Sequence, residues 1–131
     1  MIDIESAVYT TVTTALREQF PGINIEGVAT YSPAKFPTVC IEESDNYADR
    51  NTANTASNEN YAVVVYEVNA YSNKSSGKKG ECKAIISAVD EVMDGLGFTR
   101  NTKVPFGDVS VYRIFARYTA IVSKNKTIYR R

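Results

Sequence analysis

Apolar and polar residues alternate along two long segments of the chain, residues 61–71 and 109–123. In the first segment the apolar set is Ala62, Val64, Tyr66, Val68 and Ala70, and in the second it is Tyr112, Ile114, Ala116, Tyr118, Ala120 and Val122. Successive side chains of a strand point to opposite faces, so this spacing predicts two strands that each bury one face. Shorter β-branched runs predict strands at 23–31, 36–43 and 98–104, the last joined to 109–123 by a turn at 105–108.

Two other segments carry apolar residues at the three- and four-residue spacing of an amphipathic helix. Residues 4–20 form the first, with Asp3 as a candidate N-terminal cap and Pro21-Gly22 as a stop. Residues 79–94 form the second, which stops at Gly95 and carries one apolar stripe: Cys82, Ile85, Ile86, Val89, Val92, Met93 and Leu96. The order α-β-β-β-α-β-β predicts one α+β domain over residues 1–131, with a mainly antiparallel sheet of about four to five strands and two helices packed on one face.

Residues 44–60 interrupt this pattern with a run of Asn, Thr, Ser and Ala that contains almost no apolar residue. Such a stretch buries too little surface to offset the entropy that is lost on ordering. Long loops inside a compact domain are usually functional or disordered. The sequence therefore predicts a mobile loop or arm at 44–60, which becomes ordered when a partner is present.

The length of 131 residues and the hydrophobic fraction of 44% are those of an ordinary globular domain. No apolar run approaches the ~20 residues of a membrane span. The acidic start MIDIESAVY lacks the basic and apolar regions of a signal peptide. These features favour an intracellular protein, in which Cys40 and Cys82 are expected to be reduced thiols placed by packing.

The net charge of zero conceals an uneven distribution along the chain. Residues 1–70 contain ten acids and three bases, whereas residues 71–131 contain five acids and twelve bases. A chain of this kind can present an acidic surface to the basic surface of a neighbouring copy. The alternative is that folding mixes the two sets of charges, because a division along the sequence need not survive in the fold.

Residue types that support catalysis or metal binding are scarce. The chain has no histidine, the commonest general base and metal ligand. The two cysteines lie far apart in sequence, unlike the paired ligands of a zinc knuckle. The acid pairs Glu42-Glu43 and Asp90-Glu91 are expected at the solvated surface, because the first points to both faces of a strand and the second lies off the apolar stripe. We expect no enzyme activity and no cofactor.

The segment NKSSGKKGE, residues 73–81, lies between a predicted strand and a predicted helix, which is where a phosphate-binding loop would occur. A Walker-type loop requires G-x-x-x-x-G-K-[ST], but Glu81 here takes the place of the hydroxyl residue. Its carboxylate would repel an anion. The segment is therefore interpreted as a solvated loop whose polar residues cap the following helix.

Four blocks of sequence carry a resemblance to a known family: FPTVCIEESDN at 36–46, YEVNAYSNKSSGKKGECKAI at 66–85, VDEVMDGLGFTR at 89–100 and SVYRIFARYTAIVSKNKTIYRR at 110–131. The chain resembles, over nearly its whole length, the small neck and tail-completion proteins of long-tailed bacteriophages that infect Gram-positive hosts. The resemblance implies a tail terminator. Such an α+β subunit forms a hexameric ring on the end of the tail tube, stops the growth of the tube and offers a surface to the head connector.

The resemblance also implies the partners and the location of the protein. The partners would be further copies in the ring, the major tail-tube protein and the head-tail connector or stopper protein. No binding to a membrane is expected. DNA would pass through the ring without specific recognition. The protein would be made in the host cytoplasm and reside in the tail or neck of the virion.

Under this resemblance, residues 44–60 would order against a neighbour or the tube, and the loop 73–80 would be a second contact surface. Arg113 and Arg117 would pair with Glu67 across the sheet or line a contact or channel. The residues expected at subunit or partner contacts are Asp45, Asp49, Arg50, Glu67, Lys74, Lys78, Lys79, Lys83, Arg113, Arg117, Lys124, Lys126, Arg130 and Arg131.

Two other functions stay open at this point. A head-side connector or stopper, or a minor tail protein, would have a similar size and fold. A nucleic-acid-binding module would use the basic arm at 124–131, where Tyr129 stands beside four cationic side chains. Four charges support only weak, salt-sensitive binding, so this second function is the less favoured.

Overall fold

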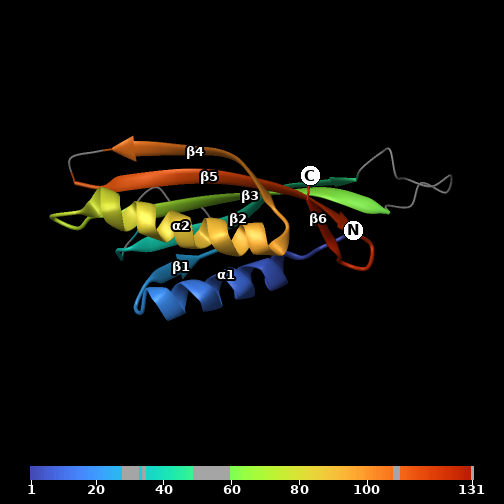
Figure 1. Ribbon diagram of the computed structural model, residues 1–131, viewed down its shortest axis with the longest axis horizontal. Coiled ribbons are helices and arrows are strands. Elements are labelled where there is room, and N and C mark those ends of the chain that lie inside the picture. The colour runs from blue at the N-terminus through green and yellow to red at the C-terminus, as the bar shows by residue number, and fades with distance from the viewer. Residues whose placement is uncertain (28–32, 34, 49–59, 108–109, 131) are drawn as a thin grey trace.

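The computed structural model describes residues 1–27, 33, 35–48, 60–107 and 110–130. Within these residues the chain forms two helices and one six-stranded sheet (Figure 1). The elements are α1 (Glu5–Gln19), β1 (Asn24–Glu26), β2 (Thr38–Ala48), β3 (Tyr61–Ser72), α2 (Lys78–Leu96), β4 (Thr99–Gly107), β5 (Tyr112–Ser123) and β6 (Ile128–Arg130). The predicted α+β class is confirmed, and the sheet has one short strand, β6, beyond the expected number.

The strand order across the sheet is β1-β2-β3-β5-β4, and β6 pairs with β5 on the same side as β4. β1 runs parallel to β2, whereas all the other pairs are antiparallel. The two central strands, β3 and β5, pair along their whole length, so that Tyr61 lies opposite Ser123 and Ser72 lies opposite Tyr112. This long antiparallel ladder positions the side chains of both faces.

Both helices pack on one face of this sheet, and α1 lies beside α2 (Figure 1). The alternate residues predicted to form the buried faces of β3 and β5 lie in the core, except Tyr112, which is partly buried against it. The stripe of α2 packs against them, with Ile85, Val89 and Met93 fully buried. Each such side chain contributes roughly 1.5–3 kcal/mol when it is removed from water. An edge-to-face contact between Tyr66 and Phe98, with ring centroids 5.4 Å apart, completes the centre of the core.

The prediction of a loop at 44–60 is wrong at its start, because residues 44–48 belong to β2. Their backbone pairs with β3, where Ala48 lies opposite Ala62. The polar side chains that suggested a loop lie mostly at the surface of this strand. At this end β2 and β3 extend past both helices (Figure 1). The remainder of the predicted arm, 49–59, lies outside the described residues.

Other predicted boundaries also differ in the structure. The described part of the strand predicted at 23–31 is a strand only at Asn24–Glu26, and residues 28–31 lie outside the described residues. Residues 105–107 continue β4 instead of forming the turn, and Pro105 is tolerated there because β4 is an edge strand. Helix α2 passes Gly95 and ends at Gly97, whose φ of 103° is the left-handed conformation that glycine supplies at helix ends. The predicted C-terminal arm is partly a strand, because β6 pairs with β5.

The start of α2 also differs from the prediction of a polar side-chain cap. Gly77 occupies the N-terminal position with a φ of 87°, and no side chain caps the helix. The hydroxyl of Ser72 instead donates a hydrogen bond of 2.5 Å to the carboxylate of Glu81 in the first turn. This carboxylate fastens the start of α2 to the end of β3. At the start of α1 the cap position is Ile4 and not the predicted Asp3, which lies one residue earlier and accepts a 3.0 Å hydrogen bond from the backbone N–H of Glu5.

Candidate interaction surface on the open face of the sheet

The face of the sheet that carries no helix, here called the open face, exposes aromatic and aliphatic side chains. Apart from Met1, the large hydrophobic residues exposed within the described part of the chain are Tyr47, Val104, Phe106 and Tyr129, at 37% to 47% of their surface. The strand register places them on the open face, because their partners across the strands are Val63, Phe115, Arg113 and Ile121. Exposed apolar groups gathered on one face are typical of an interaction site.

A polar groove crosses the middle of the open face. It has a volume of about 550 Å³ and is lined by Ser44, Asp45, Val65, Glu67, Asn101, Arg117 and Thr119. The guanidinium of Arg117 donates from Nε and Nη2 to one carboxylate oxygen of Glu67, at 3.2 and 2.9 Å. The hydroxyl of Thr119 donates to Asn101 across the β4–β5 pair. The groove therefore presents an ion pair and several hydrogen-bonding groups between two apolar areas.

Two β-bulges form the walls of this groove. One lies in β2 between Glu43 and Asp45, and the other lies in β4 between Arg100 and Thr102. The residues left without a cross-strand partner are Ser44 and Asn101, and both line the groove. A bulge bends its strand and increases the local twist. The hollow in the sheet is therefore a property of the backbone on both sides of the central strands.

Charge is divided across the sheet in the order of the strands. Every charged residue of β1, β2 and β3 is acidic: Glu26, Glu42, Glu43, Asp45 and Glu67. Every charged residue of β5, β4 and β6 is basic: Arg113, Arg117, Arg100, Lys103 and Arg130. The boundary runs between β3 and β5, where Glu67 pairs with Arg117. The two sets of charges in the sequence thus stay separate in the sheet, although both signs occur on α2.

The structure places the predicted contact residues in three regions. Asp45, Glu67, Arg117 and Arg113 lie on the open face. The second region is the loop before α2 together with the first turns of α2, and it contains Lys74, Lys78, Lys79 and Lys83. The helix begins at Lys78, one residue before its predicted start. The third is the turn after β5 with the strand β6, and it contains Lys124, Lys126 and Arg130. Asp49, Arg50 and Arg131 lie outside the described residues.

The two arginines of β5 make different contacts. Arg117 forms the predicted pair with Glu67, whereas the expected pairing of Arg113 with Glu67 is not found. The guanidinium of Arg113 lies over the ring of Phe106, 4.2 Å from the ring centroid. This contact holds an exposed aromatic ring and a cation together at one end of the open face, which is the kind of group that dominates binding energy at protein interfaces.

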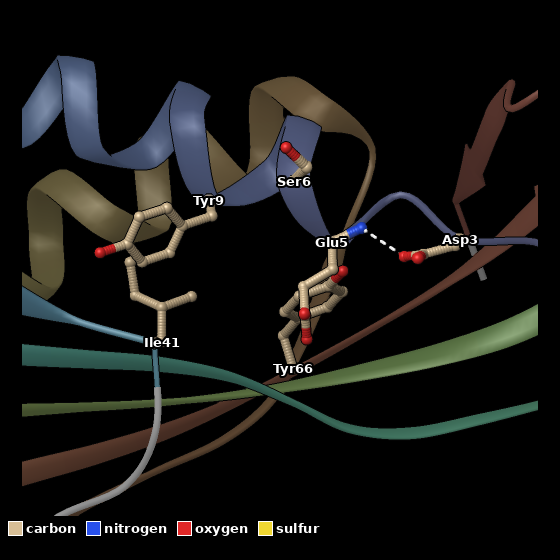
Figure 2. Close-up of a pocket in the computed structure, with 7 residues that line it drawn as sticks. Asp3, Glu5, Ser6, Tyr9, Ile41 and Tyr66 are labelled. Atoms are coloured by element: carbon tan, nitrogen blue, oxygen red, sulfur yellow. Dashed lines mark hydrogen bonds between the residues drawn. The ribbon is translucent and has the colours of Figure 1, made fainter.

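The opposite side of the sheet contains a second pocket, of about 370 Å³, between α1 and the end of β1 (Figure 2). Its lining residues are Asp3, Glu5, Ser6, Tyr9, Gly27, Ile41 and Tyr66. Figure 2 shows Tyr9 of α1 extending toward Ile41 of β2, with Asp3 and Glu5 on the side of Tyr66. At its rim the hydroxyl of Tyr66 donates a 3.1 Å hydrogen bond to the carboxylate of Glu43.

The charges around this second pocket are all negative. Burial raises the pKa of the Glu43 carboxyl, the hydrogen bond from Tyr66 opposes this rise, and the carboxylates of Glu5 and Asp3 add to it. Burial, the adjacent carboxylate of Glu43 and the carboxylates of Glu5 and Asp3 also raise the pKa of the Tyr66 hydroxyl. The pocket, called the acidic pocket below, is therefore suited to a cationic group.

Both cysteines are buried and neither forms a disulfide, as the sequence predicts. The thiol of Cys82 donates to the backbone carbonyls of Tyr112 and Ala70, at 3.3 and 3.6 Å. Burial raises the pKa of this thiol to about 12. Since the thiolate is the reactive form, Cys82 is chemically inert in the folded protein.

Three further observations limit the functions to be considered. Among the residues that the structure describes, no group of three or more Cys, Asp or Glu side chains could hold a metal ion. No helix in this part of the chain is long and apolar enough to cross a membrane. Neither a scan of protein-family models nor a search of curated protein sequences finds a match to this chain. The function proposed below therefore depends on the surfaces of the molecule.

Proposed function

We propose that the protein is a structural subunit of a bacteriophage virion, a tail terminator. In this role copies of the chain form a ring on the end of the tail tube, stop its elongation and join the tail to the head connector. The observation that carries the proposal is the open face, where aromatic side chains surround a polar groove. A single subunit leaves this face uncovered by any described helix, and an assembly would bury it.

The composition of the open face supports a role in assembly over a role in catalysis. Tyr, Phe and Arg are the residues that contribute most to protein interfaces, and Phe106 with Arg113 supplies such a pair. Apolar area buried by a partner stabilises the complex by roughly 25 cal/mol per Å² before the loss of freedom on binding is subtracted. The polar groove offers the hydrogen-bonding groups that fix the register of the partner.

The divided charge of the sheet supports a ring in particular. Subunits of a ring join head to tail, so each copy needs two different and complementary surfaces. The acidic strands β1 to β3 and the basic strands β4 to β6 provide surfaces of opposite sign on one molecule. In the proposed virion the other partners are the tail-tube protein and the connector or stopper protein. DNA passes through the ring without specific recognition.

Electron microscopy of lysates from a phage with this gene disrupted tests the proposal. We expect overlong tail tubes that are not attached to full heads, and restoration of normal tails when the gene is supplied in trans. Free tails of normal length beside heads that have lost their DNA would instead indicate a head-side connector or stopper. Normal, infectious particles would exclude a structural role in the virion.

A further inference from the structure

The sheet has two edges whose backbone is not paired with another described strand. On one side, β4 pairs with β5 alone, and no other described strand pairs with it. On the other side, β1 pairs with β2 only at residues 38–40, and no described strand pairs with residues 41–48 beyond it. A strand edge that no other strand of its own sheet covers is a template for a strand of another chain. These two edges, called the open edges, are similar in length.

The two edges carry opposite charge. The residues of β4 include Arg100 and Lys103 and no acid. The residues of β2 include Glu42, Glu43 and Asp45 and no base. Two copies that met through the same edge would bring like charges together, which destabilises a cross-strand pair. Contact between the β4 edge of one copy and the β2 edge of the next brings opposite charges together. The charges of the two edges therefore favour a head-to-tail arrangement of the copies.

The direction of the strands suits the same arrangement. β2 and β5 point one way along the sheet, and β3 and β4 point the other way, because each neighbouring pair is antiparallel. When two copies stand side by side with their helices on the same side, β4 of one therefore runs antiparallel to β2 of the next. Antiparallel pairing is slightly the more stable kind. The bulges at Ser44 and Asn101 add the twist and curvature that a closed ring of sheets requires.

One contact follows from the faces of the two strands. Lys103 lies opposite Ala116, a core residue, so its exposed side chain is on the helix-covered side of β4, near the middle of the strand. Glu43 lies opposite Tyr66 on the same side of β2, and it lies near the middle of the open stretch 41–48. The acidic pocket lies beside this stretch of β2, beyond the last residue of β1. The carboxylates of Asp3 and Glu5 line this pocket and Glu43 lies at its rim, so an ammonium group fits there. The apolar wall of the pocket contains Tyr9 and Ile41.

We infer that copies of this chain join by antiparallel pairing of β4 with residues 41–48 of β2 of the next copy, and that Lys103 of one copy enters the acidic pocket of its neighbour. This pairing is the contact between neighbouring subunits of the proposed ring, and the closure of the ring rests on the proposed function. The pairing itself is expected in the purified protein, without any other phage component. The raised pKa of Glu43 is consistent with it, since a cation in the pocket would lower that pKa again.

Charge reversal in the purified full-length chain tests the inference. The variants are Lys103→Glu, Glu5→Lys in the pocket, and Arg17→Glu as a matched charge reversal at an exposed position of α1. Size is measured by light scattering and sedimentation at high protein concentration and low salt, and circular dichroism verifies the fold. We expect oligomers for the wild-type protein and for Arg17→Glu, and at least a tenfold weaker association for Lys103→Glu and Glu5→Lys alone.

Mixing provides the decisive measurement. An equal mixture of Lys103→Glu and Glu5→Lys copies restores complementary charge at every contact, as does the double variant in one chain, so both should reassemble. Hydrogen exchange of the β4 amides should slow on assembly. Four results would each overturn the inference: a mixture that stops at a dimer, free exchange of these amides in the oligomer, a wild-type protein that stays monomeric, or loss of assembly in Arg17→Glu. These results do not depend on any phage, so failure here is distinguishable from failure of the lysate experiment.

Discussion

Tyr66 and Tyr118 lie directly opposite each other on the central strands β3 and β5, and both are buried. Their hydroxyls diverge to two different carboxylates. Tyr66 donates to Glu43 of β2, and Tyr118 donates to Asp90 of α2, each at 3.1 Å. Two large polar side chains are thus accommodated in the centre of the core because each hydroxyl reaches an acceptor at the rim. The pair fastens β2 on one side and α2 on the other.

The first prediction concerns these two hydroxyls. Tyr66→Phe and Tyr118→Phe keep the rings in place and each remove one hydrogen bond, so each should lower the free energy of unfolding by about 0.5–1.5 kcal/mol. Urea unfolding followed by circular dichroism measures the change. The effect of Tyr118→Phe should be the smaller, because Asp90 keeps its 3.1 Å ion pair with Arg100. Equal stability of Tyr66→Phe and the wild-type protein would show that the hydrogen bond to Glu43 contributes nothing.

The second prediction concerns pH and Glu43. Its pKa in the folded protein is raised by burial, with Glu5 and Asp3 adding to the effect and Tyr66 opposing it. A carboxyl with a raised folded pKa stabilises the fold when it is protonated, and this contribution is lost as the pH rises through that pKa. Glu43→Gln should therefore be more stable than the wild-type protein at pH 7. The difference should disappear below about pH 4, where the carboxyl is protonated in both states.

Thermal unfolding of the two proteins at pH 7 and at pH 3.5 measures this difference. Glu91→Gln removes the same charge from an exposed position of α2 and controls for the change in net charge. A stability difference of the same size at both pH values would show that the amide acts by packing and not by the loss of charge.

The sequence predicts the core of this fold well because its apolar periodicity follows the packed faces. The alternation along β3 and β5 and the stripe of α2 match those faces, with Tyr112, Val92 and Leu96 only partly buried at the margin. Val63, Asn69 and Tyr71, on the other face of β3, are also buried, and the alternation does not predict this. The end of β2 is not predicted, since its side chains at Ser44 and Asp45 are exposed and polar and only the backbone pairing with β3 makes it a strand. β6 is too short to produce a pattern of its own.

The candidate surface is predicted only in part. Charge alone suggested Asp45, Glu67 and Arg117, and these three do meet in the polar groove. The groove also needs Ser44 and Asn101, which no local pattern indicates, because neither bulge contains a glycine and each depends on the register of a distant strand. The division of charge between the two halves of the sequence survives in the sheet because the first three strands lie together on one side.

The third prediction concerns the thiols. Cys40 and Cys82 are buried, and the pKa of Cys82 is raised to about 12 by burial. Neither should react with an aromatic disulfide reagent in the folded protein at pH 8, whereas both should react at once in guanidinium chloride. The variant Lys103→Cys supplies an exposed thiol as a positive control, because position 103 is on the surface of β4. Rapid reaction of the folded wild-type protein would mean that the core opens on the time scale of the assay.

The fourth prediction concerns the ion pair in the polar groove. A double-mutant cycle with Glu67→Gln and Arg117→Gln should give a coupling energy of about 0.2–1 kcal/mol in the monomer, since both side chains are reached by solvent. The coupling should fall as sodium chloride is raised, because salt screens exposed pairs. A coupling of several kcal/mol that salt leaves unchanged would show that the groove is closed to solvent.

The last prediction separates the open face from the helix-covered side of the molecule. Phe106→Asp places a charge in the exposed aromatic area beside Arg113, where no core packing is lost, so the unfolding free energy should change by less than about 0.5 kcal/mol. If partners cover this face, the same change should reduce complementation of a phage lacking the gene by at least tenfold. Thr14→Asp, on the exposed side of α1, is the matched control and should complement normally. Normal complementation by Phe106→Asp would mean that the open face is not covered in the virion, and the proposed function would lose the observation that carries it.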